Sequence, residues 1–154
     1  MPEKETTHVL HMRHALDLAN EALADGDWPV AAVIARGDEI LSTGRGRQNT
    51  ASDPTAHAET DALAQARRAG VSVAGATLYC TMEPCPMCAF ALHLHGIRHV
   101  VLGARHADLR RTDLGTYSIE GFAEMMGIDL RLTTGIENNA CVALRRAWGR
   151  DQTR

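Results

Sequence analysis

The chain has 154 residues, of which 45% are hydrophobic and 23% are charged, and its formal net charge is -3. This length fits one domain with one core, and the composition argues against a disordered or fibrous protein. The small negative charge gives no global reason to expect nucleic acid or an anionic membrane as partner, although a local basic patch is still allowed.

The N-terminal third of the chain predicts a helix followed by a hairpin. Apolar residues spaced four, three and four apart place one helical face over residues 8–25, and Gly26 follows as a stop signal. Two apolar runs joined by a Gly-Asp turn then predict strands near 29–35 and 39–43. No segment repeats, so these elements are expected to belong to one domain over residues 1–154.

The rest of the chain predicts alternating helices and strands. Asp53 suits the N-cap and Pro54 the first position of a helix over about 54–69. The remaining elements are a strand at 76–82, a helix at 85–96, a strand at 99–104, a short helix at 116–127, a strand at 128–135 and a helix at 137–150. Strands that alternate with crossover helices predict a layered α/β domain with about five strands. We expect residues 150–154 to form a frayed tail.

The cysteines and the N-terminus indicate a reducing compartment. The first residues show neither a signal-peptide pattern nor an apolar run long enough to span a membrane, so a cytoplasmic protein without membrane attachment is expected. The four cysteines, Cys80, Cys85, Cys88 and Cys141, could form two disulfides by number alone. A domain of this size does not need such bonds, and reduced thiols are therefore expected.

The stretch "EPCPMC", residues 83–88, places Cys85 and Cys88 three residues apart where a helix begins. The N-terminus of a helix favours anionic sulfur, which suits both a metal site and a redox pair, so this motif alone leaves both open. A closed structural zinc site needs two more ligands, and Cys80 and Cys141 do not form a second pair of the usual spacing. A four-cysteine zinc clamp is therefore not expected.

The stretch "TAHAE" supplies His57 and Glu59, and His57 precedes Cys85 by 28 residues. One His and two Cys are three protein ligands, which leave the fourth tetrahedral position of zinc open for water, as in a catalytic site. A carboxylate beside that water can accept its proton, which gives Glu59 a role without metal binding. Taken singly, His57 would be a capping or core histidine and Glu59 a solvated carboxylate, but the combination favours a metal site.

The motifs "HAE" and "PCPMC" resemble those of the zinc-dependent cytidine deaminase superfamily. The stretches "DPTAHAE" and "TLYCTMEPCPMC" are similar to guanine deaminases and bacterial tRNA adenosine deaminases, and "HLHGIRHVVLG" resembles fungal-type cytosine deaminases. The resemblance implies a three-layer α/β/α sandwich on a mixed sheet, with one zinc on His57, Cys85 and Cys88. It also implies Glu59 as the proton shuttle of a hydrolytic deamination, and a homodimer.

The substrate-contacting residues are harder to assign. By resemblance, Asn49 is expected to hydrogen-bond the heterocycle, although its distance from "HAE" is about three residues shorter than in the compared enzymes, and an ordinary turn is the alternative. Trp28, Ala58 and Glu83 are also expected at the substrate. Trp28 could instead be a core or rim residue, and Glu83 could instead brace the cysteine loop.

The leading prediction is a deaminase of a small-molecule heterocyclic amine, most simply a free nucleobase such as guanine or cytosine. The alternative is a tRNA adenosine deaminase that makes inosine, and a non-catalytic zinc-stabilised binding module is a third, which Glu59 disfavours. Basic residues of the C-terminal segment could contact RNA phosphate, but a solvated helix face is the expected role. These residues are Arg145, Arg146, Arg150 and Arg154.

Overall fold

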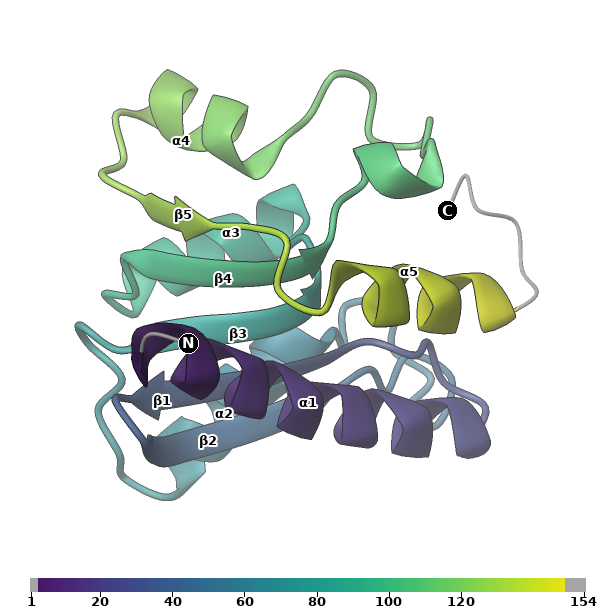
Figure 1. The fold of residues 1–154 in the computed structure, drawn as a ribbon, viewed down its shortest axis with the longest axis horizontal. Coiled ribbons are helices and arrows are strands. Elements are labelled where there is room, and N and C mark those ends of the chain that lie inside the picture. Colours follow the sequence, from purple (N-terminus) through teal and green to yellow (C-terminus); the bar gives the residue numbers. More distant parts are fainter. Residues whose placement is uncertain (1–2, 149–154) are drawn as a thin grey trace.

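The computed structural model describes residues 3–148, and its centre is one five-stranded sheet with the strand order β2-β1-β3-β4-β5 (Figure 1). The strands are β1 (Ala31–Arg36), β2 (Glu39–Arg45), β3 (Thr77–Met82), β4 (His99–Ala104) and β5 (Arg131–Thr133). β1 pairs antiparallel with β2 and β3, whereas β4 pairs parallel with β3 and β5. The mixed sheet of five strands is therefore confirmed.

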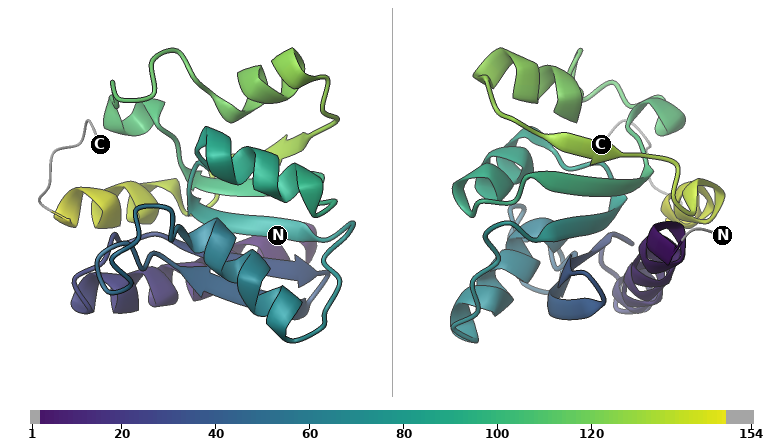
Figure 2. Two further views of the ribbon diagram at one scale, coloured as in Figure 1. Left: turned by 180° about the vertical axis from the view of Figure 1, so that it is seen from behind. Right: turned by 60° about the vertical axis from the view of Figure 1, so that its left-hand side comes forward.

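Helices cover both faces of the sheet (Figure 2). One face carries α2 (Ala58–Arg68), α3 (Pro86–Leu94) and α4 (Ile119–Met126), and the other carries α1 (Glu3–Ala24) and α5 (Asn138–Ala147). The three-layer α/β/α arrangement is thus confirmed. The single domain over residues 1–154 stays a prediction.

Two hydrophobic clusters hold the layers together, one on each face of the sheet. On β3, Leu78 and Cys80 belong to the cluster beneath α2 and α3, while Tyr79 between them belongs to the cluster beneath α1 and α5. Side chains alternate between the two faces of a strand, so one strand supplies both clusters. Because β3 lies in the middle of the sheet, both faces are covered and nearly all of its residues are buried.

The second helix begins later than predicted, because Asp53 and Pro54 form a turn before it. The Oδ1 atom of Asp53 accepts hydrogen bonds from the backbone N–H and the hydroxyl of Thr55, so it closes a local turn and caps no helix. The N-cap is His57, and the helix runs over Ala58–Arg68. The prediction of a helix from residue 54 with Asp53 as N-cap is therefore wrong.

The other boundaries differ from the predictions by a few residues. The last strand is shorter than predicted, and a 3-10 helix, η1 (Ala107–Leu109), follows β4 unforeseen. The predicted frayed tail, with Arg150 and Arg154, lies outside the described residues.

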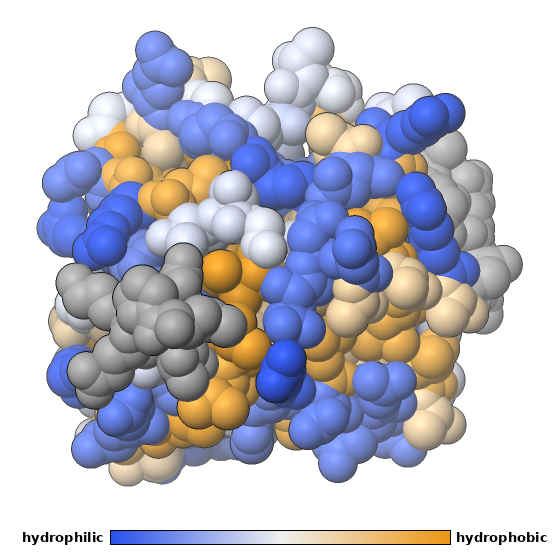
Figure 3. Space-filling model, in the orientation of Figure 1, coloured by the Kyte–Doolittle hydropathy of each residue, from blue (hydrophilic) through white to orange (hydrophobic). Residues whose placement is uncertain are grey.

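None of the helices within residues 3–148 combines the length and hydrophobicity that crossing a membrane requires, and the cytoplasmic location stays a prediction. On the face over α1 and α5, hydrophobic and hydrophilic residues are interleaved (Figure 3).

Candidate metal centre and active site

Two helix N-termini meet at one end of the sheet and bring three metal-ligating side chains together. His57 is the N-cap of α2, Cys85 is the N-cap of α3, and Cys88 lies in the first turn of α3. Pro86 occupies the first position of α3, where its fixed backbone angle suits a helix start, as the sequence predicts. The ligand atoms of the three residues all lie within 4.8 Å of one another.

The spacing of these atoms fits a tetrahedral zinc ion. The Nδ1 atom of His57 lies 3.6 Å from the Cys85 sulfur and 3.5 Å from the Cys88 sulfur. Zinc bonds of about 2.05 Å to nitrogen and about 2.3 Å to sulfur, at a tetrahedral angle, place the two ligand atoms about 3.6 Å apart. The Nε2 atom of His57 is 3.1 Å from the Pro54 carbonyl and can donate to it, which leaves Nδ1 for the metal.

The electrostatics of the three groups favour a thiolate before any metal binds. Hydrogen bonds that the Cys85 sulfur accepts from Cys88 and from His57 lower the pKa of Cys85 to about 4. The hydrogen bond with Cys85, followed by burial, raises the pKa of the Cys88 thiol. The hydrogen bond to Cys85 raises the pKa of His57 despite its burial. A cation that bound here would displace the protons that these groups share.

Glu59 lies in the first turn of α2, beside these three residues. Its side chain is buried, with 3% of the residue exposed, and burial raises the pKa of its carboxyl group. The thiol of Cys80 is 3.1 Å from its Oε1 atom and donates to it. From the sequence we expect Cys80 only as a reduced thiol outside a zinc clamp. Side chains alternate along β3, and this alternation places Cys80 on the face beneath α2, where it can reach Glu59.

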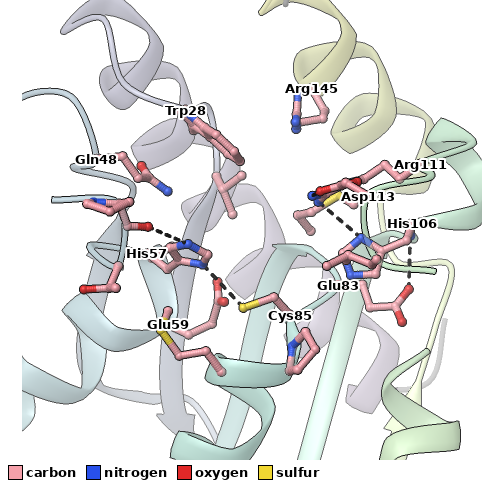
Figure 4. Close-up of a pocket in the computed structure, with 18 residues that line it drawn as sticks. Trp28, Gln48, His57, Glu59, Glu83, Cys85, His106, Arg111, Asp113 and Arg145 are labelled. Carbon is pink, nitrogen blue, oxygen red and sulfur yellow. Dashed lines mark hydrogen bonds and ion pairs between the residues drawn. The ribbon is translucent and has the colours of Figure 1, made fainter. Parts of the chain in front are cut away.

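Two of the three metal-ligating residues, His57 and Cys85, line a cavity of about 350 Å³, and Cys88 is buried beside it (Figure 4). This volume is within the range of small-molecule sites. Its lining is formed by Trp28, Val30, Gln48, Pro54, Thr55, His57, Ala58, Glu59, Met82, Glu83, Cys85, Pro86, Met87, His106, Arg111, Asp113, Leu114 and Arg145. Trp28, Ala58 and Glu83 are thus placed where the sequence analysis expects substrate. Their contact with substrate stays a prediction.

Asn49 does not line this cavity, and its neighbour Gln48 does. The loop is held by Asp27, whose Oδ1 accepts the backbone N–H groups of Asn49 and Thr50. The side-chain amide of Asn49 donates to the carbonyl of Gly26 at 2.8 Å. This anchoring turns Asn49 away from the metal-ligating residues. In the sequence, the shortened interval between Asn49 and "HAE" is the feature that indicates a different loop.

Glu83 braces three segments around the cavity. Its Oε1 accepts from Nε of Arg105 at 2.8 Å and from the backbone N–H of His106 at 3.1 Å, and its Oε2 accepts from the backbone N–H of Ile119 at 2.9 Å. These bonds join the cysteine loop to the segment after β4 and to the start of α4. From the sequence, Glu83 could either contact the substrate or brace the cysteine loop. The contacts seen in the structure are those of a brace.

Arg145 differs from its predicted role. The sequence analysis expects a solvated arginine, but only 2% of Arg145 is exposed, and its guanidinium lies 5.3 Å from the ring centroid of Trp28. The neighbouring Arg146 is exposed, as expected. The part of α5 that carries Arg145 reaches the cavity (Figure 4), so one of two adjacent arginines is turned inward, an outcome that charge alone cannot predict.

The site residues fall within a match to a known protein family. The model of the cytidine and deoxycytidylate deaminase zinc-binding region matches residues 5–104, which include His57, Glu59, Cys85 and Cys88. The chain belongs to this deaminase family. The zinc-binding character of the family agrees with the nitrogen and two sulfurs that lie within 4.8 Å of one another.

Relatives of this deaminase chain include enzymes that act on tRNA. A tRNA-specific adenosine deaminase of Haemophilus influenzae is 35% identical over 133 residues, which are 84% of this chain and 76% of that protein. A tRNA-specific adenosine deaminase of Bacillus subtilis is 38% identical over 101 residues, which are 64% of this chain and 63% of that protein. The chain thus spans slightly less than two thirds of the length of the Bacillus relative.

A solved structure with the same fold holds a purine analogue. The structure of a mutant of NE0047 in complex with 8-azaguanine superposes on this chain with a TM-score of 0.79 and 26% identity. The superposition covers 92% of this chain and 83% of that one. The fold of the deaminase chain is therefore that of its family over nearly its whole length.

Proposed function

We propose that the chain is a zinc-dependent hydrolytic deaminase that removes an amino group from a nucleobase and releases ammonia. The observation that carries the proposal is the convergence of the ligand atoms of His57, Cys85 and Cys88 beside a cavity that Glu59 also lines. These three residues would hold a zinc ion, which would supply Lewis acidity and make water a nucleophile at neutral pH.

Glu59 is the proton shuttle in this proposal. Its buried carboxyl group lines the cavity without belonging to the three ligating residues, so it is available to the attacking water. Glu59 accepts a proton from the water and delivers protons to the ring nitrogen and to the leaving amine. The hydrogen bond from Cys80 fixes one oxygen of the carboxylate, which orients the other toward the cavity.

We expect Glu59→Gln to retain zinc and to lose turnover by a factor of about 10² or more, because general acid–base catalysis contributes that much. Zinc content is measured by inductively coupled plasma mass spectrometry and turnover by ammonia release. The exposed Glu124→Gln on α4 carries the same chemical change and should keep both. Near wild-type turnover in Glu59→Gln would refute the role assigned to Glu59.

For the substrate, we propose adenosine in tRNA, which the reaction converts to inosine. The two relatives described above are tRNA-specific adenosine deaminases, and they support this alternative better than the free nucleobase that leads the sequence analysis. A free purine such as guanine is the second candidate, favoured by the likeness to the 8-azaguanine complex.

The two candidates are separated by a substrate panel. Inosine formation in a tRNA anticodon stem-loop is followed by mass spectrometry, and ammonia release is followed with free guanine, cytosine and adenine and with their nucleosides. Inosine in the stem-loop with no ammonia from the free bases supports the first candidate. Turnover of a free base with none of the stem-loop would replace it by the second.

We also propose that the chain forms a homodimer through α3. Met87, Phe90 and Leu94 lie along this helix at helical spacing and are 38%, 38% and 69% exposed, so they form an uncovered apolar stripe. Light scattering coupled to gel filtration tests the proposal with Leu94→Glu, which should yield monomers. Leu10→Glu, at another exposed position, on α1, is the control that should stay dimeric. A wild-type monomer would refute the proposal.

A further inference from the structure

The cavity has a second polar side, opposite His57. In Figure 4, Gln48 and His57 lie on one side and Cys85 lies in the middle, while His106, Arg111 and Arg145 project from the opposite side. These three come from the segment after β4, the loop after η1 and helix α5. His106 and Arg145 are 6% and 2% exposed, so both polar groups face the cavity and not bulk water.

His106 presents a hydrogen-bond donor to the cavity. The Nη1 atom of Arg111 donates to Nδ1 of His106 at 3.4 Å, so Nδ1 is the acceptor and the ring proton belongs on Nε2. This Nε2 atom is buried and has no hydrogen-bond partner among residues 3–148. A buried polar group without a partner is rare in native proteins and calls for an acceptor that fills the adjoining space.

The charges on this side of the cavity favour an anion. Asp113 forms an ion pair with Arg111, with 2.5 Å between Oδ2 and Nη2, and Glu83 is engaged by Arg105. Arg145 adds a second guanidinium, and burial together with the charge of Arg111 lowers its pKa. An anionic group in the cavity would stabilise both guanidinium groups, because like charges in a buried site repel each other.

Trp28 lies near both His57 and Arg145. Its ring centroid is 6.5 Å from that of His57, and the guanidinium of Arg145 lies 5.3 Å from the centroid of Trp28. A group held by Arg145 would therefore lie about one aromatic ring away from His57. A nucleotide fits such a separation, because a ribose lies between its base and its phosphate.

We infer that His106 Nε2 and the guanidinium of Arg145 form a subsite for a phosphate group of the substrate, with Arg111 orienting His106. This subsite rests on the proposed deaminase function for its substrate, and it specifies that the substrate is a nucleotide unit. A planar guanidinium fork matches the oxygens of phosphate, and a neutral imidazole N–H supplies a further donor. The phosphate can be the monoester of a free nucleotide or the phosphodiester of an RNA.

Phosphate binding is tested first without turnover. Inorganic phosphate is titrated into the zinc-loaded protein by isothermal calorimetry, with Arg145→Gln and His106→Phe as variants and circular dichroism as the check of folding. Each variant should bind phosphate roughly tenfold more weakly or worse, since it loses a charge-assisted or buried hydrogen bond. Arg146→Gln removes the same charge from the neighbouring exposed position and should bind like the wild type.

Catalysis then distinguishes the source of the phosphate. The ratio kcat/KM is compared for adenine, adenosine, adenosine monophosphate and the stem-loop. Arg145→Gln should lose roughly tenfold or more on the phosphorylated substrate that the enzyme uses, and less than about threefold on an unphosphorylated one. A preference for the monophosphate assigns the subsite to a monoester, and a preference for the stem-loop assigns it to a phosphodiester.

The failure of the subsite and the failure of the deaminase proposal give different results. If the wild type binds no phosphate at millimolar concentrations, or if Arg145→Gln and His106→Phe fold and bind it unchanged, the subsite is refuted. An equal loss on all four substrates also refutes it. If phosphate binds as expected but no amine is released from any substrate, the deaminase proposal fails and the subsite stands.

Discussion

Replacement of Glu83 by Gln should destabilise the protein far more than it weakens substrate binding. The carboxylate accepts three hydrogen bonds, from Arg105 and from the backbone N–H groups of His106 and Ile119. The amide keeps one acceptor oxygen and turns an N–H toward a donor on the other side. Each buried donor left without an acceptor costs about 1–3 kcal/mol, so we expect a loss of about 2–4 kcal/mol in the free energy of unfolding.

The measurement is urea unfolding of the zinc-loaded protein, followed by circular dichroism, together with kcat and KM on the best substrate of the panel. Glu120→Gln is the matched control, because Glu120 also contacts Arg105 but 51% of its side chain is exposed, so a loss of at most about 1 kcal/mol is expected. If Glu83→Gln lost less than about 1 kcal/mol while KM rose tenfold, Glu83 would be a substrate contact and the bracing argument would be refuted.

Three further changes test other parts of the structure. Gly44→Ala would place a Cβ 2.3 Å from the backbone nitrogen of Ala62 in α2, so we expect the helix to shift and the protein to lose about 1–3 kcal/mol in urea unfolding; an unchanged midpoint would contradict this. Cys85→Ser should lose most of its bound zinc by mass spectrometry, whereas Cys141→Ser should keep it; equal zinc contents would argue against the ligand set. Burial lowers the pKa of His99 to about 4 in the folded protein. As the pH falls, the unfolded chain therefore binds a proton near pH 6.5, before the folded chain does. The contribution of neutral His99 to the free energy of unfolding is complete above pH 6.5 and is lost as the pH falls toward 4. His99→Gln should reduce this loss by about 1–2 kcal/mol, allowing for the partial exposure of the ring. If the free energy of unfolding of the variant and of the wild type changed in parallel with pH, the role of His99 would be refuted.

The sequence predicts those parts of the site that depend on local signals. His57, Cys85 and Cys88 are recognisable because a ligand set needs particular residue types at helix starts, and Pro86 marks one of these starts. The helical periodicity and the alternating strands likewise predict the layers of the fold. The beginning of α2 was misplaced because Asp53 satisfies its hydrogen-bonding capacity in a turn, which competes with capping and uses the same residue types.

The opposite end of the cavity was not predictable, because it depends on how distant segments pack. His106 follows β4 and Arg145 belongs to the last helix, and no spacing in the sequence relates them. Of two adjacent arginines, only Arg145 is turned inward, by the rotation of α5 on the sheet. Gln48 replaces Asn49 at the cavity because Asp27 anchors the loop from another part of the chain.

The position of β3 has a consequence for the order of folding. His57 and Cys85 are 28 residues apart, and the chain between them contains α2 and the central strand. Helix α2 is attached to the N-terminal hairpin through the hydrogen bond from Ser42 to the carbonyl of Ala62, whereas α3 follows β3 directly. The two halves of the ligand set therefore reach each other only after β3 has inserted beside β1, a non-local step that is slow compared with forming the hairpin. Metal capture is thus a late event in the maturation of the chain, and a nascent chain that ends before residue 88 cannot hold the ion with its full set of ligands.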